Sequence, residues 1–121
     1  MLNLKSEKDR FKEEFRQRIK RFVLALINFI ESLPRDTTCK IISSQLLRSG
    51  TSIGANYFEA RAASSKSDFT NFFSHSLKSA NESRFWPETL VEAKKCSYQQ
   101  ASHLLNEFSE IANVSQQAFS R

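Results

Sequence analysis

The amino-acid sequence predicts an all-α protein that folds as an antiparallel up-down-up-down four-helix bundle. Apolar residues recur every three or four positions through four long segments, which is the spacing of a buried helix face. The chain has only two glycines and two prolines, too few for the turns of an all-β fold or for phosphate-binding loops. The connections between the segments are short, which favours antiparallel neighbours.

The first helix is expected at residues 6–33. Its apolar residues are separated alternately by four and three positions, which predicts a seam that faces the bundle interior. These residues are Phe15, Ile19, Phe22, Leu26, Phe29 and Leu33. Pro34 then ends the helix, because the residue before a proline is disfavoured in helical conformation.

The second helix is expected at residues 37–62, with Asp36, Thr37 or Thr38 as its cap. Gly50 and Gly54 lie within its apolar pattern, although a glycine inside a helix costs about 1 kcal/mol relative to alanine. Two glycines one turn apart therefore predict that a neighbouring helix approaches closely at this point.

The third helix is expected at residues 68–95, after a serine-rich loop and with Asp68 as its cap. Pro87 removes a backbone hydrogen bond to Ser83 and predicts a kink. The alternative is a broken helix that restarts at Pro87.

The fourth helix is expected at residues 98–118, and residues 1–121 are expected to form a single domain. Ser97 and Gln100 have the spacing of a capping box, in which each side chain bonds the backbone N–H of the other residue. Its buried stripe is expected to hold Ala101, Leu104, Leu105, Phe108, Ile111 and Ala112.

A soluble cytoplasmic protein without membrane partners is expected. The first ten residues are charged and lack the apolar core of a signal peptide, and the most apolar run, residues 22–30, is too short to span a bilayer. Cys39 and Cys96 have no metal or redox spacing and are expected to be reduced, with a disulfide between them as the alternative.

Part of the sequence resembles a known family. The stretches that carry the resemblance are QLLRSGTSIGANYFEA, a serine-rich loop followed by DF, and LKSANESRFW. They resemble the bacterial four helix bundle protein family, also called 23S rRNA intervening-sequence proteins, whose relatives include the accessory variability determinant of diversity-generating retroelements. The resemblance extends from about Phe22 to Ala93. The sequence departs from the family pattern at Phe58, where a smaller residue is common, and at Pro87, where a helix-forming residue is normal.

The resemblance implies a small antiparallel bundle that assembles into a homopentamer. Family members encoded within intervening sequences of ribosomal RNA genes have no established activity, whereas the retroelement relatives present a basic surface and bind nucleic acid and a reverse transcriptase. The partners that it implies are therefore further copies of the chain, RNA or DNA, and a reverse transcriptase. No cofactor is expected.

The first half of the first helix is basic. Residues 5–21 hold eight basic and four acidic residues, which accounts for most of the formal net charge of +5. Like charges every four residues repel along one helix stripe unless an anion covers them, which predicts phosphate binding. The candidate nucleic-acid-binding residues are Lys5, Lys8, Lys12, Arg16, Lys20 and Arg21. The alternative is a solvated face whose charges are partly cancelled by Asp9 and Glu13.

A second candidate group is polar. It comprises Arg48, Ser52, Asn56 and Glu59 on the second helix, with Ser49 beside them, and Ser79 and Glu82 on the third. We interpret these residues as an internal polar layer that fixes helix register. The alternative is a ligand or phosphate site.

Adjacent aromatic residues point about 100° apart on a helix, so a narrow seam does not readily bury both members of a pair. The sequence has three such pairs, at residues 57/58, 72/73 and 85/86. Phe58, Phe72 and Phe85 are therefore candidates for an oligomer interface, with base stacking as the competing interpretation.

No enzyme motif is present. His75 and His103 have no carboxylate three or four residues before them, and no metalloprotease, P-loop or nucleophile-elbow pattern occurs. We expect no catalytic and no metal-binding residues. The expected function is that of a non-catalytic homo-oligomer that binds nucleic acid, RNA foremost, as a ribonucleoprotein component or retroelement accessory factor. The alternative is a protein-interaction scaffold without nucleic-acid binding.

Overall fold

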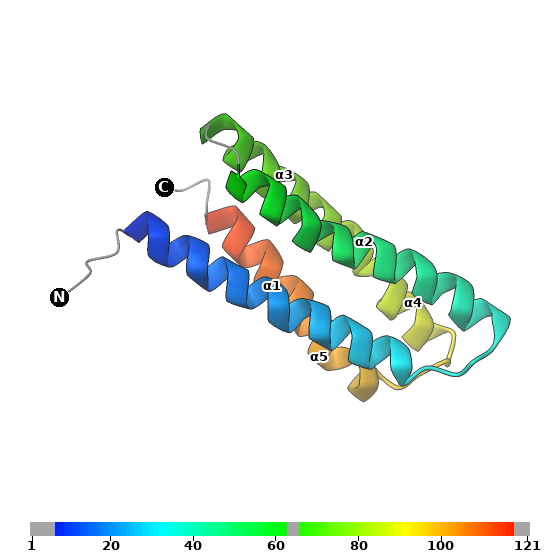
Figure 1. Cartoon of the computed structure of the whole chain (residues 1–121). Coiled ribbons are helices and arrows are strands. Elements are labelled where there is room, and N and C mark those ends of the chain that lie inside the picture. Colours follow the sequence, from blue (N-terminus) through cyan, green and yellow to red (C-terminus); the bar gives the residue numbers. More distant parts are fainter. Residues whose placement is uncertain (1–6, 63–65, 118–121) are drawn as a thin grey trace.

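The computed structural model describes residues 7–62 and 66–117 and confirms the all-α fold class (Figure 1). Every regular element in these two ranges is a helix. The helices are α1 (Glu7–Glu31), α2 (Thr37–Ala62), α3 (Lys66–Ser83), α4 (Phe85–Glu92) and α5 (Tyr98–Gln117). Helices α3 and α4 together occupy the place of the expected third helix, so the architecture is the predicted four-helix bundle.

The helices pack in the order in which they occur along the chain. Helix α1 contacts α2, α2 contacts α3, and α5 closes the bundle by contacting both α3 and α1. Figure 1 shows the first turn of α1 and the last turn of α5 at the same end of the bundle. This is the up-down-up-down arrangement that short connections favour.

The expected third helix is interrupted at Arg84. Its backbone angles there remain helical, at φ −59° and ψ −25°, and hydrogen bonds of 3.2 Å join Arg84 N to Ala80 O and Glu88 N to Arg84 O. Pro87 lies in the first turn of α4, where a missing N–H costs little. The expected third helix is therefore divided into α3 and α4, and α4 begins at Phe85, before Pro87.

Helix α4 ends at Glu92, earlier than residue 95, where the sequence pattern places the end. Lys94 adopts a left-handed conformation with φ 62°. Its N–H bonds Val91 O at 3.0 Å, and the N–H of Lys95 bonds Leu90 O at 2.9 Å. These two bonds form a Schellman motif, in which the left-handed residue is usually glycine. Because lysine occupies that position here, the sequence does not indicate where the helix ends.

The core follows the predicted apolar stripes. All six seam residues of the first helix are buried, as are most members of the stripe of α5. The buried apolar residues of these two helices are Phe15, Ile19, Phe22, Ala25, Leu26, Phe29, Ala101, Leu104, Leu105, Phe108 and Ile111, and Leu33 is buried just after α1. Ala112 is half-buried and packs against this core.

Helix α1 is the neighbour that approaches the two glycines, which confirms the predicted close approach. A Cβ atom added at Gly50 would clash with the side chain of Leu26, and one added at Gly54 would lie 3.3 Å from Cγ2 of Ile19. Further along the same contact, Tyr57 Oη donates a 2.7 Å hydrogen bond to the carbonyl oxygen of Lys12.

Polar contacts tie the connections at one end of the bundle. Asp36 is the cap of α2, since its Oδ1 accepts a 2.8 Å bond from the N–H of Cys39. Its Oδ2 lies 3.0 Å from Lys95 Nζ in the connection before α5. The capping box is confirmed by bonds of 2.9 and 3.1 Å between Ser97 and Gln100. The starts of α2 and α5 are thus both capped by the residues that the sequence indicated.

Candidate functional site

The candidate basic residues that the structure describes lie along α1. Lys12 and Arg16 are half-buried, and Lys20 and Arg21 are exposed. Lys5 lies outside the described residues, and Lys8 belongs to α1 without a described side chain. Because residues four apart are offset by about 6 Å and about 40° around a helix, the series from Lys12 to Lys20 winds gradually from the α2 side towards the outer face.

Neighbouring carboxylates take up part of the basic charge. Arg16 Nη1 lies 3.5 Å from Glu13 Oε1 on the same helix, and both side chains are partly exposed. Arg18 faces α5, with Nη1 3.5 Å from Glu107 and Nη2 3.8 Å from Glu110. Arg18 therefore joins α1 to α5, whereas Lys20 and Arg21 are exposed to solvent.

Among the residues whose side chains are described, the polar layer expected between the second and third helices does not form as predicted. Arg48, Asn56 and Glu82 are exposed, and Ser79 is half-buried. The hydroxyl of Ser52 donates to the carbonyl oxygen of Ser49 in its own helix at 2.9 Å. The side chain of Glu59 lies outside the described residues. Arg48, Asn56 and Glu82 thus face solvent, so the expectation of an internal network was wrong for these residues.

Other polar residues join the helices instead. The hydroxyl of Ser83, which is buried, bonds the hydroxyl of Ser49 at 3.0 Å between α3 and α2. Arg84 Nη1 donates to Ser109 Oγ of α5 at 3.0 Å. Ser49 was among the residues expected in the polar layer, but its partner Ser83 and the pair Arg84 and Ser109 were not predicted, because these partners are far apart in the chain.

The aromatic candidates differ in their exposure. Phe72 is buried together with Phe73, and its ring centroid lies 5.8 Å from that of Phe15 and 5.5 Å from that of Tyr57. The prediction that Phe72 lies at an oligomer interface was therefore wrong: rings from α1 and α2 enclose both members of this pair. The side chain of Phe58 lies outside the described residues.

Phe85 is the candidate that remains at the surface. It is 57% exposed, and its ring centroid lies 5.1 Å from that of Trp86 in an edge-on arrangement. Other large apolar side chains exposed in the described residues are Leu24, Ile27, Ile41, Leu47 and Tyr98.

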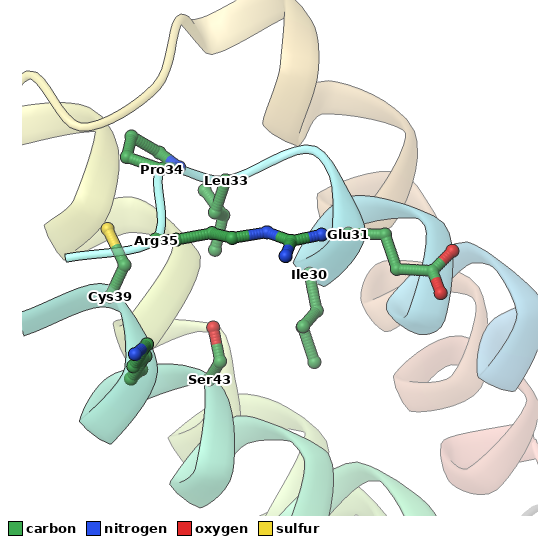
Figure 2. Close-up of a pocket in the computed structure, with 8 residues that line it drawn as sticks. Ile30, Glu31, Leu33, Pro34, Arg35, Cys39 and Ser43 are labelled. Carbon is green, nitrogen blue, oxygen red and sulfur yellow. The ribbon is translucent and has the colours of Figure 1, made fainter. Parts of the chain in front are cut away.

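A pocket of about 340 Å³ lies at the connection between α1 and α2 (Figure 2). Its lining residues are Ile30, Glu31, Leu33, Pro34, Arg35, Cys39, Lys40 and Ser43. In Figure 2 the Arg35 side chain extends towards Ile30 and Glu31. Burial raises the pKa of the Cys39 thiol, so this thiol is a poor nucleophile. Cys39 and Cys96 are both free thiols.

The described residues contain neither a metal-binding group of side chains nor a membrane-spanning helix. Among residues 7–62 and 66–117, no group of three or more histidine, cysteine, aspartate or glutamate side chains is arranged to hold a metal ion. Within the same ranges no helix has the length and apolar character that a membrane crossing requires.

Comparison with known proteins identifies similar sequences and structures. The family model described as 23S rRNA-intervening sequence protein matches residues 12–117. A crystal structure of a protein of unknown function from the S23 ribosomal protein family of Bacteroides thetaiotaomicron is 31% identical. The match covers 92% of this chain and 99% of that one, with a TM-score of 0.82. A search of curated proteins found no match.

Proposed function

Because this chain belongs to the 23S rRNA-intervening sequence protein family, we propose that it is a non-catalytic, homo-oligomeric bundle that binds RNA through the basic side of α1. The observation that carries this proposal is the series Lys12, Arg16 and Lys20, three cations at four-residue intervals. The family name refers to sequences inserted in ribosomal RNA, which favours RNA over DNA as the nucleic acid.

Electrostatics supports a phosphate ligand for this series. Cations about 6 Å apart on one helix repel one another, and Glu13 is the carboxylate paired with Arg16. A phosphate backbone relieves this repulsion and releases its own condensed counterions. Self-association repeats the series on every copy and strengthens the field that attracts RNA.

The test is an RNA titration in rising salt with a charge-reversal variant. In K12E/R16E/K20E we expect weaker binding of a fluorescently labelled single-stranded RNA. The slope of log affinity against log salt should fall by about 2, since about 0.7 counterion is released for each phosphate contact. Fluorescence anisotropy measures both quantities.

The matched control is K40E/K78E/K94E, which changes the net charge equally at exposed positions on α2, α3 and the α4–α5 connection. It should keep most of the wild-type affinity. Equal weakening of both variants would reject α1 as the binding surface. Undetectable RNA affinity of the wild-type protein in moderate salt would reject RNA binding altogether.

The second candidate function is a protein-interaction scaffold without RNA binding. The exposed apolar residues favour it, since Leu24 and Phe85 are each more than half exposed, and such residues often mark contact surfaces. The resemblance to pentameric relatives supports fivefold self-association in either case. A wild-type protein that self-associates but has no RNA affinity would favour the scaffold.

A further inference from the structure

One face of α1 carries an apolar pair flanked by opposite charges. Leu24 is 62% exposed and Ile27 is 37% exposed, and Lys20 and Glu31 are exposed on either side of them. We call these four residues the α1 outer seam. At about 100° per residue they fall within an arc of about 60°, on the side opposite the buried seam.

The two charged ends of the α1 outer seam have no side-chain partner among the described residues. Neither Lys20 nor Glu31 makes a side-chain hydrogen bond or ion pair with any of the residues that the structure describes. Arg35 extends towards Glu31 in Figure 2 without forming an ion pair. Both charges are therefore available to another molecule.

The α1 outer seam is symmetric about its centre. Its spacings are four, three and four residues, so reversing the helix superposes Leu24 on Ile27 and Lys20 on Glu31. We propose that the α1 outer seam is a docking surface for a second copy of this chain, with the two α1 helices antiparallel about a twofold axis between Leu24 and Ile27. Each Leu24 then contacts the Ile27 of the other copy, and each Lys20 faces the Glu31 of the other copy.

Charge complementarity selects this occupant and this orientation. A parallel pair would place two lysines together at one end and two glutamates at the other, which costs energy at both ends. The antiparallel pair forms two opposite-charge contacts around an apolar centre, as an isologous interface requires. RNA does not fit the whole seam, because Glu31 repels phosphate and the centre is apolar.

The contact is small. The seam is about 16 Å long on each helix, and its apolar centre consists of Leu24 and Ile27. A patch of this length belongs to the weak end of protein interfaces. We therefore expect association that depends on protein concentration.

This inference rests on the self-association proposed above and specifies one of its contacts, and it does not require RNA binding. A twofold contact closes with two copies, so a fivefold ring needs a separate, head-to-tail contact elsewhere. The outer seam then joins two copies that belong to different assemblies.

The test is a charge exchange followed by sedimentation velocity over a concentration series. Lys20→Glu alone and Glu31→Lys alone each place like charges opposite one another at both ends, and each should raise the dissociation constant about tenfold. The double variant K20E/E31K restores opposite charges and should return the dissociation constant to near the wild-type value. Leu24→Asp should remove this association at all concentrations tested.

The matched control is K78E/E82K, the same exchange at exposed positions on α3, which should leave association unchanged. All these sites are exposed, and circular dichroism confirms that each variant folds. A double variant as weak as the single variants, or an unchanged Leu24→Asp variant, would overturn the twofold contact and leave other self-association standing. A wild-type protein that is monomeric at every concentration would reject self-association as a whole. Because Lys20 belongs both to the seam and to the series proposed to bind RNA, Glu31→Lys and Leu24→Asp, which change the seam and leave that series intact, distinguish the two proposals.

Discussion

Gly50 and Gly54 determine how closely α2 approaches α1. Both are buried, and the side chains of Leu26 and Ile19 occupy the space where their Cβ atoms would lie. The two positions differ in how much room is left. Leu26 would have to move for an alanine at Gly50, whereas at Gly54 the nearest atom is 3.3 Å away and a shift of a few tenths of an ångström suffices.

This difference predicts opposite effects for one substitution at the two sites. Alanine gains about 1 kcal/mol of helix propensity over glycine, but overpacking of a core costs about 1–3 kcal/mol. Gly50→Ala should therefore destabilise the protein by about 1 kcal/mol, and Gly54→Ala should be neutral or slightly stabilising. Urea denaturation measures both. Equal stabilisation by the two substitutions would mean that the α1–α2 contact is looser than the structure indicates.

The sequence predicted individual residues well where one periodic pattern determined their environment. The glycine contact and the six-residue seam of the first helix are examples, because large apolar residues have no alternative to the core. It failed for Arg48, Asn56 and Glu82, which are exposed. A polar side chain is stable both at the edge of a helix–helix contact and in solvent. The spacing of such residues in the sequence therefore does not determine which of the two environments they occupy.

At the scale of elements, Asp36 links the start of α2 to the connection that precedes α5. The N–H of Cys39, and after it the ammonium group of Lys95, lower the pKa of Asp36 from 3.8 to about 2. The same carboxylate raises the pKa of Lys95. Asp36 binds its proton more weakly in the folded state than in the unfolded chain, so its contribution to stability is present above about pH 4.

Stability should therefore fall as the pH drops from about 4 to about 2, and part of this loss should be absent in Asp36→Asn. Asparagine is as good a helix cap as aspartate but cannot pair with Lys95, so this variant isolates the charge. Lys95 has the opposite pH dependence. Because its pKa is raised in the folded state, its contribution to stability is lost as the pH rises above the ordinary pKa of lysine. Thermal unfolding of both proteins across the acid range provides the measurement. Parallel stability curves for the two proteins would contradict the linkage.

The ends of elements were harder to predict than their existence. The capping box at Ser97 and Gln100 and the cap at Asp36 are local patterns, because each joins residues only three positions apart in the sequence. The end of α4 depends on Lys94 in a left-handed conformation, for which lysine gives no signal. Pro87 predicted a disturbance, but the interruption falls at Arg84 because the proline fits the first turn of a new helix.

At the scale of the whole molecule, two of the apolar sites exposed among the described residues differ in kind. The α1 outer seam is self-complementary, whereas Phe85 on α4 is a single aromatic residue that stands beside Trp86. A head-to-tail ring joins two different surfaces of each copy. Phe85 is the candidate whose side chain is described and exposed, since Phe72 is enclosed in the core and the side chain of Phe58 lies outside the described residues.

Phe85→Asp should therefore separate the two modes of association. Phe85 is 57% exposed, so an aspartate there costs the monomer little, but it places a carboxylate in any interface that covers the ring. We expect light scattering to show loss of the larger assembly, while pairs formed through the α1 outer seam persist. Leu24→Asp should have the reverse effect: the twofold pairs are lost and the larger assembly remains. If the mass of Phe85→Asp equalled that of the wild-type protein, α4 would be excluded as a contact surface and the head-to-tail contact would have to use another exposed residue, such as Ile41 or Tyr98.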